Sequence, residues 1–283
     1  MSIIVMADGG ANITKSMIKK YEIDILPYNI VFANGDVYKD IVDIKNQKKL
    51  LDLMYQHDDL PKIGHLNMDN MESVFRKHIE NGDDILYITS SSKFSNSYKK
   101  AVSVSKKFDP SMIEIVDSLN VGSGETLLAL YAREYIKLGH GLRQTAKYLN
   151  EIKHDIKSCY AVGNSNYLYN KKYCKGKNNN YFDIQNSFPI VEVNKGQLIL
   201  TYSTKEGELA LQILKNAITD NCNSIDKTPV IIAYSGDKSI CSKLKEYISK
   251  SFSKNIIVLE HNTLVFLNTG LNTLSITFLG KSN

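Results

Sequence analysis

The chain has 283 residues, of which 43% are hydrophobic and 23% are charged, and its formal net charge is +5. This length allows one large domain or two modest ones, and the composition is that of a globular protein, which excludes a disordered or fibrous chain. The lysines are spread along the chain, as expected for residues on solvated helix faces. No nucleic-acid partner is therefore expected.

The N-terminal segment "MSIIVMADGG" enters an apolar run without a basic region or a small-residue cleavage site, so it predicts a first strand and not a signal peptide. No apolar run approaches the ~20 residues of a membrane span, so no stable membrane insertion is expected. The four cysteines lack CxxC or CxxH spacing, which supports neither a disulfide framework nor a zinc site. We expect a cytoplasmic protein.

Short apolar runs alternate with segments of helical period, and this pattern predicts a parallel sheet covered by helices through about residue 155. In chain order, the predicted strands are Ile3–Ala7, Ile25–Phe32, Ile85–Thr89, Met112–Val116, Ser158–Val162, Ile190–Val193, Leu198–Tyr202, Val230–Ala233, Ile256–Leu259, Leu264–Leu267 and Leu274–Phe278.

The second half of the chain has a different pattern. The segment "PIVEVNKGQLILTYS" predicts a hairpin that turns at Asn194-Lys195-Gly196, followed by a helix from about Lys205 to Asp220. We therefore expect an N-terminal α/β domain over residues 1–155 and a C-terminal α+β domain over residues 156–283. The polar insert "NKKYCKGKNNNYFDIQNS" predicts a loop.

Polar residues follow three of the predicted strands. Asp8 and Gly9 follow the first, a hydroxyl cluster in "ITSSSKFSNS" follows the strand at 85–89, and Asp117-Ser118 follow the next. Because ligands of open parallel sheets collect at the carboxyl ends of the strands, these groups favour a cradle for a carboxylate or phosphate. The alternative is that the hydroxyls only cap the helices that follow.

Binding is favoured over catalysis. These strand ends carry no nearby histidine, and the chain has no GxSxG, P-loop, GxGxxG or HExxH motif. We therefore expect a protein that is not an enzyme and has no cofactor or metal. An enzyme that uses Asp8 and Asp117 as an acid/base or metal pair remains an alternative.

Several segments resemble motifs of the DegV family of bacterial fatty-acid-binding proteins. "ITSSSKFSNSYKKA" is similar to the family's "ISSxLSGTYxSA", and "VDSLNVGSG" is similar to the entry into its "DSxxxSxGxG" helix. "DILPYNIVFANGDVYKD" matches the segment after its "VPL" strand at Leu26-Pro27-Tyr28, and "FPIVEVNKGQL" matches its hairpin. Order and spacing hold over nearly the whole chain.

The resemblance implies a two-domain fold with a long-chain fatty acid held between the domains, its carboxylate on hydroxyls and its tail in an apolar tunnel. It implies a carrier that presents a lipid, with a fatty acid kinase subunit as a candidate partner. By this resemblance and the strand-end pattern, the expected ligand-binding residues are Asp8, Gly9, Ile63, Gly64, His65, Ser91, Ser92, Ser95, Asn96, Ser97, Asp117, Ser118, Asn268, Thr269 and Gly270.

The chain departs from the family at four motifs: "TSQP", "HTGPG", the "DSxxD" that becomes Asp8-Gly9-Gly10-Ala11-Asn12, and the "GGR" that has no clear Arg equivalent in the Lys- and Asn-rich loop. The segment Ile63–Leu66 replaces the family's "TSQP", so the Thr-Ser hydroxyl pair is missing, although His65 offers a cation there if it is protonated. Asn268 replaces the His of "HTGPG". A second reading is therefore a divergent interaction or regulatory module that has lost carboxylate binding.

Overall fold

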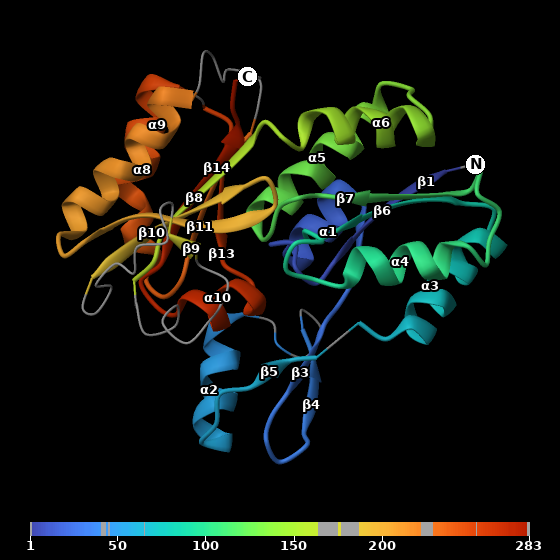
Figure 1. The fold of residues 1–283 in the computed structure, drawn as a ribbon, viewed down its shortest axis with the longest axis horizontal. Helices are drawn as coiled ribbons and strands as arrows, with labels where there is room; N and C mark the ends of the chain where they lie inside the picture. Colours follow the sequence, from blue (N-terminus) through green and yellow to red (C-terminus); the bar gives the residue numbers. More distant parts are fainter. Residues whose placement is uncertain are drawn as a thin grey trace. The chain divides into compact units, whose positions relative to one another are not determined.

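The computed structural model describes residues 2–40, 44, 46–64, 66–163, 175–176, 187–221, 229–252 and 254–281 (Figure 1). It divides into two compact units, Met1–Lys153 and His154–Asn283, with a boundary two residues before the one expected from the sequence. Among the helices in these ranges, none is long and apolar enough to cross a membrane.

The first unit contains a four-stranded parallel sheet in the order β2-β1-β6-β7, as the sequence predicted. Its strands are β1 (Ile3–Asp8), β2 (Ile23–Leu26), β6 (Asp84–Thr89) and β7 (Ile113–Asp117). Their near-continuous apolar runs suit a sheet that is covered on both faces. Asp8 lies opposite Leu26 and Thr89 lies opposite Asp117, so all four strands end along one edge.

Five helices of this unit pack on the sheet: α1 (Lys15–Tyr21), α3 (Met68–Glu80), α4 (Ser97–Ser105), α5 (Ser123–Lys137) and α6 (Leu142–Ile152). Figure 1 shows α3 and α4 on one face and α5 and α6 on the other. On α3 the apolar spacing predicted from the sequence places Met71 and Phe75 in the core, with both side chains fully buried.

A small antiparallel sheet branches from the first unit in the order β4-β3-β5, beside helix α2 (Gln47–His57). Its strands are β3 (Asn29–Val31), β4 (Val37–Lys39) and β5 (Lys62–Ile63). The single strand predicted over Ile25–Phe32 is wrong: Pro27, which has no N–H to donate to a ladder, lies in the gap between β2 and β3.

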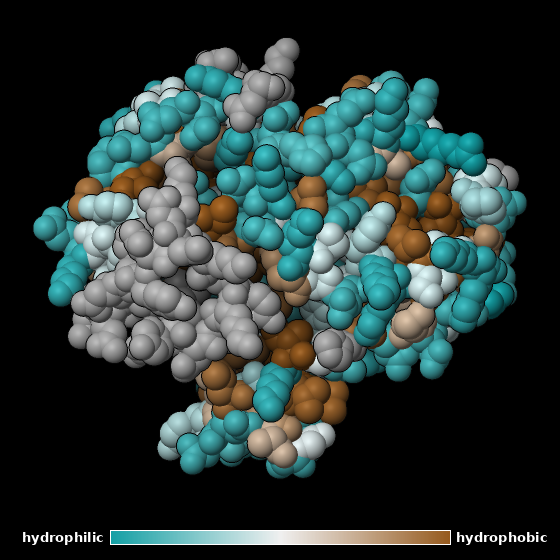
Figure 2. All heavy atoms as spheres, viewed as in Figure 1, coloured by the Kyte–Doolittle hydropathy of each residue, from teal (hydrophilic) through white to brown (hydrophobic). Residues whose placement is uncertain are grey.

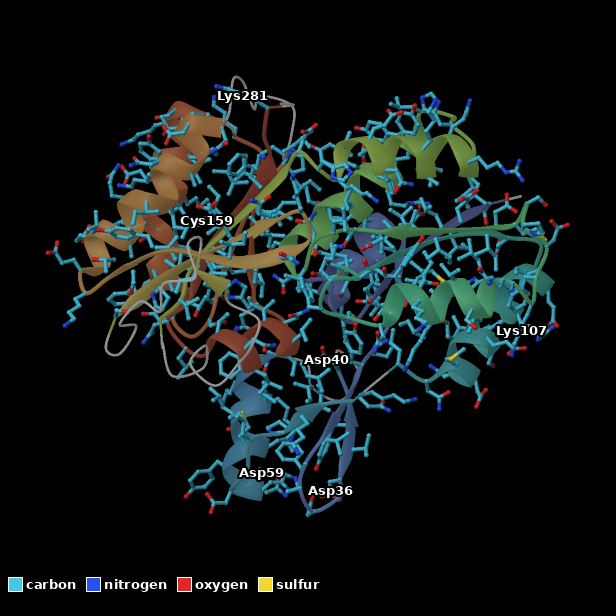
Figure 3. The ribbon with its side chains drawn as sticks, viewed as in Figure 1. Asp36, Asp40, Asp59, Lys107, Cys159 and Lys281 are labelled. Carbon is cyan, nitrogen blue, oxygen red and sulfur yellow. The ribbon has the colours of Figure 1, made fainter. Side chains whose placement is uncertain are left out.

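The small sheet has its own aromatic packing and an apolar surface. The Phe32 and His57 rings stack with centroids 4.2 Å apart, and the Ala33 N–H donates to Asp59 near the tip of the hairpin (Figure 3). Figure 2 shows hydrophobic residues at the surface of this region, where Val37 and Leu60 are about half exposed.

The second unit is built on a mixed sheet in the order β13-β12-β14-β8-β10-β11-β9. Its strands are β8 (Ile156–Ala161), β9 (Lys175–Gly176), β10 (Phe188–Asn194), β11 (Gln197–Thr204), β12 (Val230–Tyr234), β13 (Ile256–Glu260) and β14 (Leu274–Leu279). Its helices are α8 (Gly207–Asn221), the 3-10 helix η1 (Lys238–Cys241), α9 (Ser242–Ser251) and α10 (Thr263–Thr269).

The hairpin predicted in this unit is confirmed. β10 and β11 pair antiparallel up to Asn194 opposite Gln197, and the two residues between them, Lys195 and Gly196, both have positive φ. Two such residues form the type I′ turn that suits the twist of a hairpin. The α+β class expected for the second half is therefore correct.

The strand predicted over Leu264–Leu267 is wrong, because these residues lie in α10. The Asn262 side chain accepts the Val265 N–H at the start of this helix, and Gly270, with φ of 70°, follows its end. A four-residue apolar run does not distinguish a strand from a buried helical turn, and the local caps decide between them.

The core of the second unit lies between its sheet and helices α8 and α9. Leu214, Ile218, Leu244, Ile248 and Ile276 are fully buried in one cluster. Cys159, on β8, and Cys241 belong to the same cluster as free thiols (Figure 3). Cys174 and Cys222 lie outside the described residues.

Candidate functional site

The hydroxyl cluster predicted after β6 lies at the start of α4, where it contacts Tyr28. The Tyr28 hydroxyl lies 2.9 Å from Ser97 Oγ, and Ser97 Oγ lies 2.7 Å from Ser95 Oγ. Tyr28 and Ser97 are buried, whereas Ser95 is partly exposed. The segment between β2 and β3 and the first turn of α4 therefore form a chain of hydroxyls that leads from the interior to the surface.

Ser95 also has the local role that the alternative reading gave it, because its Oγ accepts the Ser97 N–H at 3.1 Å. Asn96, the N-cap residue of α4, makes no side-chain capping bond and is exposed. Accepting that N–H uses a lone pair of Ser95 and leaves its hydroxyl hydrogen available, so capping and ligand binding are compatible at this residue.

Ser91, Ser92, Asp117 and Ser118 organise the loops beside this cluster. Ser91 Oγ accepts the Lys93 N–H, and Asp117 Oδ1 accepts the N–H groups of Ser92 and Leu119 at 3.1 Å each. Ser118 Oγ exchanges hydrogen bonds with the backbone of Asn120. These contacts hold the ends of β6 and β7 together, and the Ser92 side chain is exposed beside them.

Asp8 belongs to a fully buried cluster with Ser90 and Glu125. Asp8 accepts the backbone N–H groups of Gly10 and Ser90 at 2.8 and 2.9 Å, and Ser90 Oγ lies 2.8 Å from Asp8 Oδ1 and 2.9 Å from Glu125 Oε2. One hydroxyl hydrogen cannot serve two carboxylates, so one carboxyl must be protonated.

The protonated carboxyl is that of Glu125. Burial, and then the negative charge of Asp8, raise the pKa of Glu125 well above its ordinary value. Two backbone N–H groups and the Ser90 hydroxyl surround Asp8 with donors, so the Asp8 carboxyl is the acceptor of the pair. The geometry therefore indicates a hydrogen-bond chain in which Glu125 donates to Ser90 and Ser90 donates to Asp8.

Two glycines make room for these clusters. A Cβ on Gly10 would lie 1.8 Å from Ser90 Oγ, and a Cβ on Gly9 would lie 2.6 Å from Tyr28 N. Any side chain at either position would therefore displace a group of the cluster. The expected site residue Gly9 thus packs directly against the Tyr28 ring.

Ile63 and Gly64 are connected to the segment that carries Tyr28 through the strand pairing of the small sheet. Ile63 pairs with Ile30 in the small sheet, and the Gly64 N–H donates to the Asn29 carbonyl at 2.7 Å, one residue from Tyr28. The Lys100 ammonium on α4 donates to the Leu66 carbonyl at 2.8 Å. His65 lies outside the described residues.

The remaining predicted site residues, Asn268, Thr269 and Gly270, lie in the second unit at the end of α10. Asn268 Nδ2 and Thr269 Oγ1 donate to the carbonyls of Leu264 and Val265, one helical turn back, and Gly270 follows the helix with positive φ. These contacts give the three residues a structural role in ending α10.

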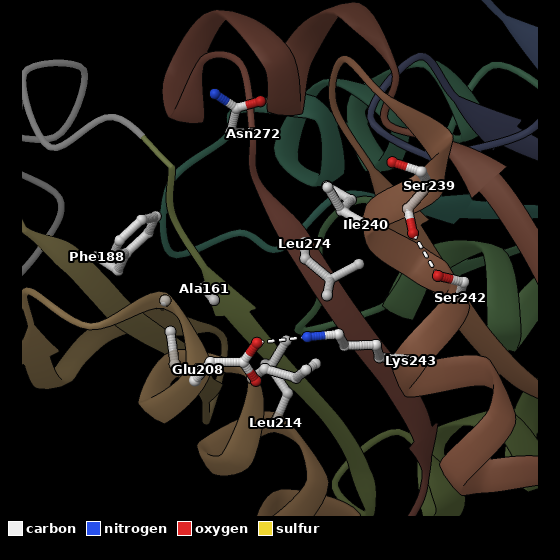
Figure 4. A pocket seen from close by; sticks show the side chains of 13 residues that line it. Ala161, Phe188, Glu208, Leu214, Ser239, Ile240, Ser242, Lys243, Asn272 and Leu274 are labelled. Atoms are coloured by element: carbon white, nitrogen blue, oxygen red, sulfur yellow. Dashed lines mark hydrogen bonds and ion pairs between the residues drawn. The ribbon is translucent and has the colours of Figure 1, made fainter.

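The second unit contains a cavity of about 320 Å³ between α8, η1 and the sheet (Figure 4). Leu214 and Leu274 line its interior from the buried core, and Glu208 and Lys243 form an exposed ion pair among the lining residues. This volume lies near the lower end of the range of small-ligand pockets, ~300–1,000 Å³. The apolar part of this lining suits a hydrocarbon group, and polar residues such as Ser239 and Asn272 lie beside it.

Asp8 and Asp117, which the enzyme alternative would pair, accept hydrogen bonds from different sets of groups. Across the described ranges, no group of three or more His, Cys, Asp or Glu side chains is placed to hold a metal ion.

The chain matches the family model for DegV, described as "Uncharacterised protein, DegV family", over residues 2–281. The chain belongs to the DegV family. A DegV domain-containing protein of Clostridium acetobutylicum is 26% identical, and the alignment covers 99% of each chain. Another, from Streptococcus pyogenes, is 21% identical over the full length of both chains.

Solved DegV structures share this fold. A DegV lipid binding protein of Thermotoga maritima superposes with a TM-score of 0.86 at 21% identity and covers 100% of each chain. A stearic-acid-binding protein of Eubacterium ventriosum superposes with a TM-score of 0.83 at 20% identity, with 99% of each chain covered. The fold expected from the resemblance is thus confirmed.

Sequence reasoning did not find the roles of Tyr28, Ser90 and Glu125 in this DegV family member. The signal for Glu125 was a carboxylate at the third position of the apolar helix "SGETLLALYA", where a solvated residue would interrupt the buried face. Tyr28 was visible only as part of a family motif, because its partner is 69 residues away.

Proposed function

We propose that this protein binds a long-chain fatty acid and acts as a lipid carrier, and that it is not a catalyst. The observation that carries the proposal is the partly exposed Ser95 hydroxyl at the start of α4, joined to the buried hydroxyls of Ser97 and Tyr28. A carboxylate accepts strong hydrogen bonds from such donors.

Two further observations support this function. Several solved structures of the same fold are named as fatty-acid-binding proteins, among them those from Thermus thermophilus and Bacillus subtilis. The cavity of the second unit has a partly apolar lining, and its apolar side chains suit part of an acyl chain. Within the described residues, the hydrogen-bond partners of Ser95 Oγ are the hydroxyl and the N–H of Ser97, and neither would act as a general base for it, which agrees with a binding role.

Calorimetric titration with saturated acids of eight to sixteen carbons tests the proposal. Because each buried methylene contributes ~0.8 kcal/mol, affinity is expected to rise steeply with chain length. Native mass spectrometry of gently purified protein is expected to show a bound mass of fatty-acid size. Flat affinity across the series would remove the carrier function and favour an interaction module.

Ser95→Ala tests the head-group contact. Loss of one hydrogen bond to a charged group weakens acid binding by ~1.5–3 kcal/mol, which is about 10- to 150-fold. Ser105→Ala is the matched control, because Ser105 lies at the other end of α4 and its hydroxyl donates to the helix carbonyl of Val102. Equal affinities of both variants would show that Ser95 is only a cap. The fatty acid kinase partner and the cytoplasmic location stay predictions.

A further inference from the structure

The hydrogen-bond chain from Tyr28 through Ser97 to Ser95 has a determined direction. Tyr28 is 6% exposed and Ser97 is 3% exposed, so neither hydroxyl can use bulk water as a partner. Within the described residues, the group that hydrogen-bonds to the Tyr28 hydroxyl is the side chain of Ser97, at 2.9 Å. The Tyr28 hydrogen must therefore point toward Ser97, because the reverse direction would leave a buried phenol hydrogen without an acceptor.

The direction of this first hydrogen bond fixes the direction of the next one, between Ser97 and Ser95. With the Tyr28 hydrogen on Ser97 Oγ, the Ser97 hydrogen points to Ser95 Oγ, 2.7 Å away. Ser95 Oγ already accepts the Ser97 N–H, so both of its lone pairs are in use. The hydrogen of the partly exposed Ser95 hydroxyl is left to point outward as a donor.

Tyr28 is suited to the head of this chain. Burial, followed by the negative charge of Asp8, raises the pKa of Tyr28 well above its ordinary value, so the phenol keeps its hydrogen at physiological pH. A phenol is more acidic than a serine hydroxyl and is the stronger donor, and each donor in a chain strengthens the next.

We propose that Tyr28 is a positioning residue that acts through Ser97 to turn the Ser95 hydroxyl into an outward donor selective for an anionic lipid head group. This inference rests on the proposed fatty-acid binding and adds to it the origin of head-group selectivity. Without the phenol, Ser95 and Ser97 are free to reverse their hydrogens, and Ser95 would then present a lone pair toward the carboxylate.

The test compares Tyr28→Phe with the wild-type protein by calorimetry, using hexadecanoic acid and hexadecanol. Because a charge-assisted bond is about twice as strong as a neutral one, affinity for the acid should fall about 3- to 10-fold and affinity for the alcohol should change less. The measured quantity is the ratio of the two dissociation constants. A general loss of packing would lower both affinities and leave that ratio unchanged.

Tyr87→Phe is the matched control. Tyr87 is fully buried on β6, and its hydroxyl has no hydrogen-bond partner within the described part of the chain. Removing this hydroxyl should leave both affinities unchanged. Circular dichroism of each variant checks that the fold is retained.

Ser97→Ala gives a second route if Tyr28→Phe does not fold. It interrupts the same chain, so it should lower the acid-to-alcohol ratio to a similar extent, and the double variant should lose little more than either single variant. Fully additive losses would overturn the proposal, because they would show that the two residues act separately.

The outcomes separate this inference from the proposed function. A lowered ratio in Tyr28→Phe and Ser97→Ala, with Tyr87→Phe unchanged, supports the positioning role. Wild-type binding of the acid together with an unchanged ratio in both variants overturns the role of Tyr28 and leaves the fatty-acid carrier intact. No binding of the acid by the wild-type protein overturns both.

Discussion

Each unit buries a titratable cluster at the ends of its strands, and in each cluster burial keeps one group neutral, an acid in the first unit and a base in the second. In the first unit, Glu125 gains a proton and donates through Ser90 to Asp8. In the second, His261 lies between Ser235, 3.0 Å from Nδ1, and Ser275, 2.8 Å from Nε2, and burial lowers the pKa of His261 to about 3.

Both clusters obey the same rule, since burial penalises the charged form of any group. The consequence for pH is opposite in sign. A buried neutral acid binds a proton that the unfolded chain releases, so the first unit loses stability as pH rises. A buried neutral histidine excludes a proton that the unfolded chain binds, so the second unit loses stability as pH falls.

The largest expected effect is acid destabilisation of the second unit. The ordinary pKa of His261 is 6.5 and its folded value is about 3, so between these values the unfolded state binds the extra proton. Stability falls as pH drops through this window, by on the order of 4 kcal/mol at its lower end. Hydrogen exchange by mass spectrometry, corrected for intrinsic rates, should show protection lost in β12 and β14 as pH falls from 7 to 4.

His261→Gln removes the titration while it keeps polar atoms near Ser235 and Ser275. Its β12 and β14 protection should vary much less over the same pH range. If the variant loses protection as steeply as the wild type, then His261 is not the group responsible. That result would contradict the pH dependence assigned to the second unit.

The pattern of the chain predicts the fold better than it predicts these clusters. The parallel strands of the first unit and the hairpin at Lys195-Gly196 were predictable because apolar runs and turn residues act locally. Ser90 and Glu125 are 35 residues apart, and Ser235 and His261 are 26 apart. No local pattern joins such partners. The sequence likewise does not show that Ser97 is buried and Ser95 partly exposed, because this difference depends on the contact of Ser97 with Tyr28.

An intermediate effect is expected from breaking the first cluster without removing a titratable group. In Gly10→Ala the new Cβ would lie 1.8 Å from Ser90 Oγ, so Ser90 must move and its bonds to Asp8 and Glu125 must weaken. We expect a loss of ~2–3 kcal/mol in the stability of the first unit. Protection should fall in β1 and β6 and stay unchanged in β12.

Gly207→Ala is the control for the change of glycine to alanine. The nearest atoms to its Cβ would be 3.8 Å away on Phe188, at the start of α8. Alanine there should stabilise the protein by about 1 kcal/mol or less, because it is the better helix former. Equal stability of the two variants would mean that Ser90 can leave the cluster at little cost.

The smallest effect at neutral pH, and the sharpest test of the sign, is expected for Glu125→Gln. Glutamine has nearly the shape of a protonated glutamate and still donates toward Ser90, so at pH 7 stability should change by about 1 kcal/mol or less. The wild-type first unit should lose stability as pH rises above 4.5, the ordinary pKa of Glu125, until its raised folded pKa is passed, at up to ~1.4 kcal/mol per pH unit. In the variant that slope should disappear, because no proton remains to be released.

Glu151→Gln, at an exposed position on α6, is the control and should keep the wild-type slope. Exchange protection of β1 and β6 between pH 5 and 9 measures both. A slope that survives in Glu125→Gln would assign the buried proton to another group and remove the opposition between the two units.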